Sequence, residues 1–411
     1  MLLRLLLTVF LQIPLDISYR LVYFSCSGDG FMNKGYIKNL FVFLGGVVML
    51  GVLLTFPTIN KAYASCSTPP PTTAAGYQDL LRGSVNGKLY HGDLGKSVAL
   101  PNGKILWVFG DTLIGTSGAT KLTVGIHNSG LLTENGCISA VTGPLDANGN
   151  ETTWVTPNAT TDVPNLDDYY WASTPFMDGS TLRMFLSHMY NDAYGFHNIG
   201  VDLASFDVSS GTPVLQSVVQ TPGSANGNTA PSWGASVLRN GYYTYIFGTV
   251  YTNTPWVWGN DYYLARVQNG RITNQSRWRY WNGSSWVSNQ SAAAKVIDGT
   301  AGVGPGATVY RKSNGQYVII TKKFDMIGSD IVAFTASNLT GPWTEVTPSL
   351  MTIPALNPPM SSSDYTYMGL GHPEITLGSG NLLVNWSVGS SDFSAFGDPQ
   401  AGVYFGEVSQ P

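Results

Sequence analysis

Five segments of the chain repeat one pattern of polar and apolar positions. Each contains a short strand-like run, a turn that ends in glycine, and a second run rich in aromatic and β-branched residues. The segments span residues 97–109, 173–185, 235–247, 307–320 and 374–386. Asn-Gly and Asp-Gly turns between such runs favour β-hairpins, because both central residues adopt positive φ angles at low cost. The pattern predicts five hairpins of one repeating unit.

The spacing of the turn glycines predicts how many units there are. Gly103, Gly179, Gly241, Gly315 and Gly380 are 76, 62, 74 and 65 residues apart, a mean of 69. Five such units fill residues 65–411. A second strand pair follows the hairpin, and four antiparallel strands make one propeller blade. We therefore predict an all-β fold in which residues 65–411 form a single five-bladed β-propeller.

The last unit has three recognisable strands, and the third of them covers residues 402–408. We expect residues 80–89 to supply the fourth strand. An N-terminal strand in this place closes the ring and protects both sheet edges.

Residues 1–64 are interpreted as a targeting segment. A basic stretch at 32–38, an apolar run at 40–56 and the small-x-small pattern at 62–64 predict a signal peptide that is cleaved after Ala64. Translation is expected to start at Met32. The mature protein is then secreted or held at the cell surface, without stable membrane insertion.

Two other interpretations of this segment stay open. The apolar run is about as long as the shortest membrane-spanning helix, which allows a membrane-anchored precursor. Cleavage before Cys66 would instead make a lipoprotein. Cys66 and Cys137 remain in the mature chain, so one disulfide is possible in an oxidising compartment.

Composition narrows the classes of partner. Only 11% of the residues are charged and the net charge is −4, so the chain has no basic surface for nucleic acid. No Cys or His spacing resembles a zinc site. We expect no metal or other cofactor at the functional site, while a structural calcium ion in the axial channel stays open. A monomer is expected.

The two ends of the predicted blades carry loops of different length. The glycine turns at one end are tight. The loops at the other end are long, and they cover residues 111–127, 151–168, 188–199, 221–233, 249–261, 290–304 and 350–371. Loops of more than about a dozen residues in a compact domain are usually functional. We expect the functional site on the face with the long loops.

Several acidic, histidine and tryptophan residues are predicted at this face. The candidate catalytic residues are Asp93, Asp111, Asp168 and Glu374. The candidate substrate-binding residues are His188, His372, Trp171 and Trp233, with Trp256 and Trp258 as an outer platform. Each of them also has a structural interpretation, since an Asp near a strand end can cap a turn and His372 can be a core histidine.

These residue types suit the cleavage of a glycosidic bond. The reaction needs two carboxyl groups, one protonated and one ionised. When several carboxyl groups share one cleft, their pKa values differ, so that one group can be protonated while another is ionised at the same pH. Aromatic faces pack on the apolar faces of sugars.

Five ordered motifs resemble a bacterial propeller family. They are Gly92-Asp93-Leu-Gly with Phe109-Gly110-Asp111-Thr112, then Trp233-Gly-Ala, Trp278-Arg-Tyr-Trp, Gly341-Pro-Trp and Gly371-His-Pro-Glu374. Over residues 87–408 the chain resembles the family of domain of unknown function 4185 and its relative numbered 5005. Members include endo-acting D-arabinanases, and the fold is similar to that of five-bladed arabinanases, xylosidases and levanases. The resemblance implies a glycoside hydrolase for a furanose-rich polymer, with Asp93 and Asp111 at the matching acidic positions.

The first functional hypothesis is a secreted glycosidase that cleaves a polysaccharide. Asp93 is expected as base or nucleophile, Glu374 or Asp168 as acid, and Asp111 as an orienting partner. Two alternatives stay open. One is a propeller that binds glycans without cleaving them, and the other is a surface scaffold whose loops bind protein.

Overall fold

The structure, a computed structural model, describes residues 68–119, 121–158, 161–223, 230–252, 254, 257–355, 364–390, 397–398 and 400–411. The predicted signal segment 1–64 lies outside these residues, as do Cys66 and Trp256. No helix of the described part is long and apolar enough to cross a membrane.

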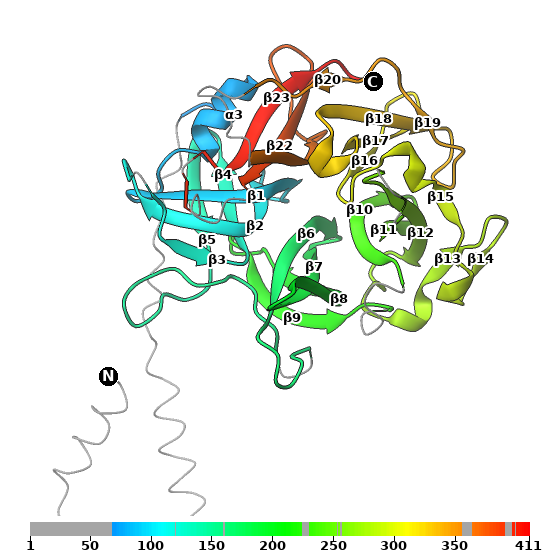
Figure 1. The fold of residues 1–411 in the computed structure, drawn as a ribbon, viewed down its shortest axis with the longest axis horizontal. Helices are drawn as coiled ribbons and strands as arrows, with labels where there is room; N and C mark the ends of the chain where they lie inside the picture. Colours follow the sequence, from blue (N-terminus) through cyan, green and yellow to red (C-terminus); the bar gives the residue numbers. More distant parts are fainter. Residues whose placement is uncertain are drawn as a thin grey trace, which may run out of the picture. The chain divides into compact units, whose positions relative to one another are not determined.

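Five antiparallel sheets form a ring around a common axis (Figure 1), which confirms the predicted five-bladed propeller. Blade 1 comprises β1 (Lys88–Ala99), β2 (Ile105–Thr116), β3 (Val124–Ile126), β4 (Ser129–Glu134) and β5 (Cys137–Val141). Blade 2 comprises β6 (Asp168–Asp178), β7 (Thr181–Asp192), β8 (Gly195–Asp207) and β9 (Val214–Gln220). Blade 3 comprises β10 (Ser232–Asn240), β11 (Tyr243–Tyr251), β12 (Asn260–Gln268), β13 (Arg279–Trp281), β14 (Trp286–Val287) and β15 (Lys295–Ile297).

Blade 4 comprises β16 (Thr308–Arg311), β17 (Tyr317–Lys322), β18 (Asp330–Ala336), β19 (Thr344–Glu345) and β20 (Met351–Thr352). Blade 5 comprises β21 (Asp364–Gly371), β22 (Leu382–Ser390) and β23 (Gly402–Val408). The helical elements of the described residues are α3 (Ala74–Leu81) and the short 3-10 turns η2 (Gln275–Arg277), η3 (Gln290–Ala292), η4 (Gly299–Ala301) and η5 (Asp325–Ile327). The first strands of neighbouring blades contact one another in blades 1 to 4, where β6 contacts β1 and β10, and β10 contacts β16.

The five turn glycines adopt the conformation that the sequence predicts. Gly103, Gly179, Gly241, Gly315 and Gly380 all have positive φ, between 60° and 91°. In blades 1 to 4 each of them joins the first and second strand.

Blade 5 departs from the predicted hairpin. β21 ends at Gly371, and the segment around Glu374 forms turns in which the Ile375 amide donates to the His372 carbonyl. Pro373 lacks an N–H group and cannot continue the strand ladder. The expected strand at 374–377 is therefore wrong, although the turn at Gly380 is present.

Ring closure also differs from the expectation. Residues 80–87 form no strand beside blade 5, which has three strands in its described residues. Helix α3 lies at the edge of β23 instead. The Gln78 side chain donates to the Val403 carbonyl at 3.3 Å and accepts from the Phe405 amide at 3.0 Å. One side-chain amide thus makes the two hydrogen bonds that a neighbouring strand would make, so a helix protects this edge.

Two of the expected long loops are mainly strand. β2 extends to Thr116 and pairs with β3, while β7 and β8 pair up to Asp192 and Gly195. The segments 111–127 and 188–199 therefore contain ordered β-hairpins. Residues of these hairpins can hold side chains in defined positions.

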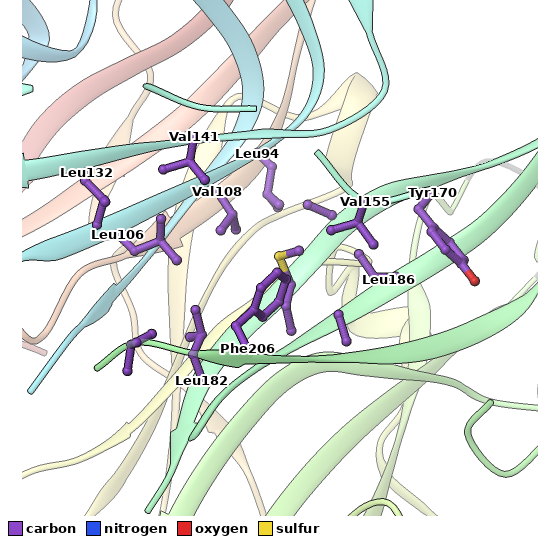
Figure 2. Close-up of a cluster of buried hydrophobic side chains, with 14 of the residues drawn as sticks. Leu94, Leu106, Val108, Leu132, Val141, Val155, Tyr170, Leu182, Leu186 and Phe206 are labelled. Carbon is purple, nitrogen blue, oxygen red and sulfur yellow. The ribbon is translucent and has the colours of Figure 1, made fainter. Parts of the chain in front are cut away.

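The apolar core lies between neighbouring blades. Figure 2 shows one such cluster, in which Leu94 and Val108 of blade 1 pack with Tyr170, Leu186 and Phe206 of blade 2. Strands with buried residues on both faces suit a ring in which each sheet has two neighbours. Cys137 is disulfide-bonded, with its partner outside the described residues.

Candidate active site

Asp93 lies in a bulge of β1. The pairing with β2 shifts register on both sides of Leu94, which has a φ of 70°, a left-handed conformation that is costly for a leucine. Two buried side chains of β22 stabilise the bulge. The Leu94 amide donates to Ser387 Oγ at 2.9 Å, and the Leu94 carbonyl accepts from Asn385 Nδ2 at 2.8 Å. Blade 5 thus holds the backbone that orients Asp93 of blade 1.

The Asp93 carboxyl group has little room. The Tyr367 hydroxyl donates to its Oδ2 at 2.9 Å. A Cβ atom on Gly110 would lie only 2.4 Å from its Oδ1, so the carboxylate uses the space that a side chain would fill. Burial, and then the negative charge of Asp111, raise the pKa of Asp93 to about 7, although the Tyr367 and Gly110 hydrogen bonds oppose the shift. Asp93 can therefore carry a proton near neutral pH.

The charge of Asp111 acts on Asp93, but Asp111 lies in a different environment. Its side chain is 47% exposed. The Trp171 indole N–H donates to its Oδ1 at 2.7 Å, and His127 Nδ1 lies 3.0 Å from the same oxygen. The His127 ring in turn stacks on Tyr169, with ring centroids 3.8 Å apart. Aromatic side chains of blades 1 and 2 thus orient an accessible carboxylate.

A further acid belongs to this neighbourhood and was missed by the sequence analysis. Asp325 lies at the start of η5, where Phe324 and Asp325 have φ angles of 52° and 34°. The negative charges of both Asp93 and Asp325 act on Tyr365, whose pKa is raised by burial first and then by these two charges. Burial also raises the pKa of Asp325. Strained backbone beside a buried acid is typical of functional sites.

Asp168 and His188 come together in a buried cluster with Asp202. His188 Nε2 lies 2.5 Å from Asp168 Oδ2, and its Nδ1 lies 3.1 Å from Asp202 Oδ2. All three side chains are at most 3% exposed. Burial lowers the pKa of His188, but hydrogen bonds to Asp202 and Asp168 outweigh this effect and raise it overall. Since successive strand residues point to opposite faces, Asp168 and Tyr170 lie on one face of β6, and Tyr169 and Trp171 on the other.

Glu374 and His372 form a second buried network. Ser97 Oγ is hydrogen-bonded to Glu374 Oε1 and, at 2.5 Å, to His372 Nδ1. His372 Nε2 lies 2.8 Å from Asn385 Oδ1. Because the Asn385 amide nitrogen already donates to Leu94, its oxygen must accept from His372 Nε2–H. Burial lowers the pKa of His372 to about 4, which favours the neutral ring.

Glu374 shares the Ser97 hydroxyl with His372. Ser97 Oγ donates to Glu374 Oε1 and also lies within hydrogen-bond distance of His372 Nδ1. Burial raises the pKa of Glu374 to about 7, although the hydrogen bond from Ser97 opposes the shift. The structure therefore places Glu374 in a network that supports the Asp93 bulge through Asn385. His372 is fully buried and is a structural member of the network.

Lys96 lies inside the ring. Its ammonium group donates to Thr174 Oγ1 of blade 2 at 2.7 Å and to the Ala235 carbonyl of blade 3 at 2.8 Å. Its charge also lowers the pKa of His372 in blade 5, and burial lowers its own pKa to about 7. A cation held between the blades disfavours a second cation beside it. Among the described residues no group of three or more His, Cys, Asp or Glu side chains could hold a metal ion.

A sequence profile described as "Domain of unknown function (DUF5005)" matches residues 76–405. The chain belongs to the DUF5005 family. The predicted family resemblance is thereby confirmed. A search of the curated proteins found no match to the chain.

Solved structures similar to this DUF5005 chain include a candidate hydrolase from Bacteroides ovatus ATCC 8483. It is 18% identical with a TM-score of 0.65, and the match covers 82% of this chain and 89% of that protein. A xylan β-1,4-xylosidase from Bacillus halodurans C-125 is 10% identical with a TM-score of 0.48, and the match covers 78% of this chain and 53% of that enzyme. A GH43_1 enzyme from Xanthomonas citri, complexed with xylotriose, is 13% identical with a TM-score of 0.46, and the match covers 82% of this chain and 94% of that enzyme. The first likeness supports the fold.

The predicted tryptophans of the DUF5005 chain divide into two groups. Trp233 is 2% exposed and packs against Trp278 and Tyr280, so its ring has no free face for a sugar. Trp171 is partly exposed beside Asp111, and Trp258 is 41% exposed near Tyr251. Trp256 lies outside the described residues. Local sequence around each tryptophan does not separate these two groups, because their burial depends on the neighbouring strands.

The tyrosines and the histidine at the site carried weaker sequence signals. Tyr365 and Tyr367 alternate along β21, and this period of two could have indicated a common face. His127 and Asp325 follow no motif. Together the arrangement brings an acid with a raised pKa, an accessible carboxylate and several aromatic rings to one place.

Proposed function

We propose that this DUF5005 protein is a secreted glycoside hydrolase that cleaves a furanose-rich, arabinan-like polysaccharide. The observation that carries the proposal is the pair Asp93 and Asp111, two neighbouring carboxyl groups in unlike environments. One has a pKa of about 7, and the other is 47% exposed and bonded to an indole N–H. Such a pair can supply one acid and one ionised carboxylate at the same pH.

The roles that we propose from these environments differ from the sequence expectation. Asp93, the more enclosed group, is the general acid. It donates its proton to the glycosidic oxygen as the bond between that oxygen and the anomeric carbon breaks. Asp111, the more exposed group, either attacks the anomeric carbon as a carboxylate or takes a proton from the water molecule that does so. The anomeric configuration of the first product distinguishes these two routes.

The substrate class rests on the family resemblance and on the aromatic residues. Tyr169, Trp171 and His127 surround Asp111, and aromatic faces suit the C–H faces of sugars. Both catalytic roles are filled by carboxyl groups, so no step of this mechanism requires a metal ion. The protein is expected to act as a monomer outside the cell.

A substrate screen tests the proposal. The purified protein is incubated with arabinan, arabinogalactan, fructan and xylan, with and without EDTA, and new reducing ends are measured. We expect release from arabinan, unchanged by EDTA, and a loss of at least about 1,000-fold in Asp93→Asn and Asp111→Asn. Full activity of Asp93→Asn would refute the assignment. Saturable glycan binding without new reducing ends would instead support a non-catalytic glycan-binding propeller.

A further inference from the structure

The hairpin of β7 and β8 presents aromatic rings to solvent. Tyr194 is 93% exposed and Phe196 is 59% exposed, although aromatic side chains gain most from burial. A single exposed apolar residue is ordinary at a protein surface. Two aromatic residues at one hairpin tip next to a candidate active site indicate a binding surface.

The hairpin has a defined shape. The Asp192 carboxylate accepts from the Tyr194 amide at 2.7 Å and lies 2.8 Å from His197 Nε2. The His197 ring stacks on Tyr190, with centroids 4.7 Å apart. Strand pairing continues to Asp192 and Gly195, so the turn itself is short. The exposed rings therefore stand on a rigid support.

The exposed surface is continuous with the candidate active site. The Phe196 ring contacts the Trp171 ring, with centroids 5.2 Å apart and planes inclined by 51°. The same Trp171 donates its indole N–H to Asp111 at 2.7 Å. Two side-chain contacts thus connect the hairpin to the carboxylate. A polymer that reaches Asp111 along Trp171 would also meet Phe196.

The charge of the hairpin narrows the ligand class. Residues 184–207 contain no Lys or Arg, and Asp192 pairs with His197. The surface therefore offers aromatic rings and no free cation for a carboxylate or sulfate group. A neutral sugar fits this chemistry, and an anionic polysaccharide does not.

We infer that the β7–β8 hairpin is a sugar-binding subsite in which Phe196 and Trp171 contact a neutral sugar unit beyond the two units joined by the bond that is cleaved at Asp111. The inference rests on the proposed function. It makes the protein an enzyme for chains of several sugars, because a disaccharide that spans the cleavage point cannot also fill this subsite.

The test compares Phe196→Ala with a matched control. Tyr242→Ala removes an equally exposed ring, 62% accessible, from the turn beside Gly241 at the opposite end of a blade. For Phe196→Ala we expect kcat/KM on arabinan to fall about tenfold, mainly through KM, with cleavage of the arabinose disaccharide unchanged. Phe196→Trp should restore activity on arabinan, and Tyr242→Ala should match the wild type on both substrates. Equal activity of Phe196→Ala and wild type on arabinan, or an equal loss on both substrates, would overturn the inference.

A binding measurement separates this inference from the proposed function. Migration of the inactive Asp93→Asn protein is measured in native gels with and without arabinan. Retardation by arabinan that disappears in Asp93→Asn/Phe196→Ala supports the subsite even if the wild type releases no reducing ends. Retardation that is the same in both proteins, or no retardation of either, refutes it.

Discussion

Replacing Gly110 by alanine should separate the position of Asp93 from the stability of the fold. Gly110 does not have a positive φ, so its backbone accepts an alanine. The new Cβ would lie 2.4 Å from Asp93 Oδ1, whereas real contacts are not closer than 3.0 Å. The oxygen must therefore move by at least about 0.6 Å. A side-chain terminus moves at low cost to the fold, but a catalytic group displaced by about 1 Å can lose about 100-fold in rate.

We therefore expect Gly110→Ala to lower kcat by about 100-fold, with a free energy of unfolding within about 1 kcal/mol of the wild type. The assay is initial-rate kinetics on the polysaccharide that the wild type cleaves, together with urea denaturation. The variant should also show a changed basic limb in its pH–rate profile, because the displaced carboxyl group leaves the environment that raises its pKa. This last readout distinguishes a displaced acid from a general loss of structure.

Gly306→Ala provides the control. Gly306 also lacks a positive φ, and the nearest heavy atom to its added Cβ would lie at 3.8 Å, an ordinary contact. Its activity should equal that of the wild type. If Gly110→Ala retains full kcat on a substrate that Asp93→Asn cannot cleave, the spatial argument about Asp93 is incorrect.

Three further predictions concern protonation, the second acid cluster and ring closure. The pKa of Asp93 is raised to about 7 in the folded protein, so the stability that its protonation contributes is complete below the unfolded pKa and is lost as pH rises through 7. The melting temperature of Asp93→Asn should therefore rise relative to that of the wild type between pH 4 and pH 8. A constant difference across calorimetric scans at these two pH values would contradict this. Asp168→Asn removes one partner of a buried pair, so its free energy of unfolding, measured by urea denaturation, should be about 3 kcal/mol lower, with kcat unchanged. A loss of kcat without a loss of stability would return Asp168 to the catalytic site. Gln78→Ala removes two hydrogen bonds to β23 and should cost about 2 kcal/mol by the same method, and an unchanged unfolding midpoint would show that Gln78 does not stabilise the edge.

Local signals in the sequence were sufficient for most of the fold. The turn at Gly241 and Tyr242, for example, depends on a positive φ at its first central residue, which glycine adopts at low cost. Five turns at regular spacing then imply five blades, because each unit has to bury both of its faces against the next. Pro373 indicates that the strand before it ends, but the prediction followed the regular pattern of the repeat and placed a strand after it.

The candidate site depended on tertiary structure. Asp93 and Asp111 could be proposed as a pair from the sequence, but their environments come from Tyr367 and Trp171, which are far away in the chain. Asp168 resembled these acids in its place before a turn glycine, and a shift of one position along β6 decides whether a side chain lies beside Trp171 or beside His188.

What the sequence determined by itself is the repeat, the turn positions and therefore the five-bladed ring, since these follow from the conformational preferences of single residues and short runs. Tertiary structure alone decided that a helix with Gln78 covers the last blade, that Glu374 and His372 support the Asp93 bulge, and that Asp325 joins the site. The hydrogen-bond partners of a carboxyl group, its burial and the charges near it come from residues of different blades. These factors set the pKa and the position of the carboxyl group, and they cannot be deduced from any single segment of the chain.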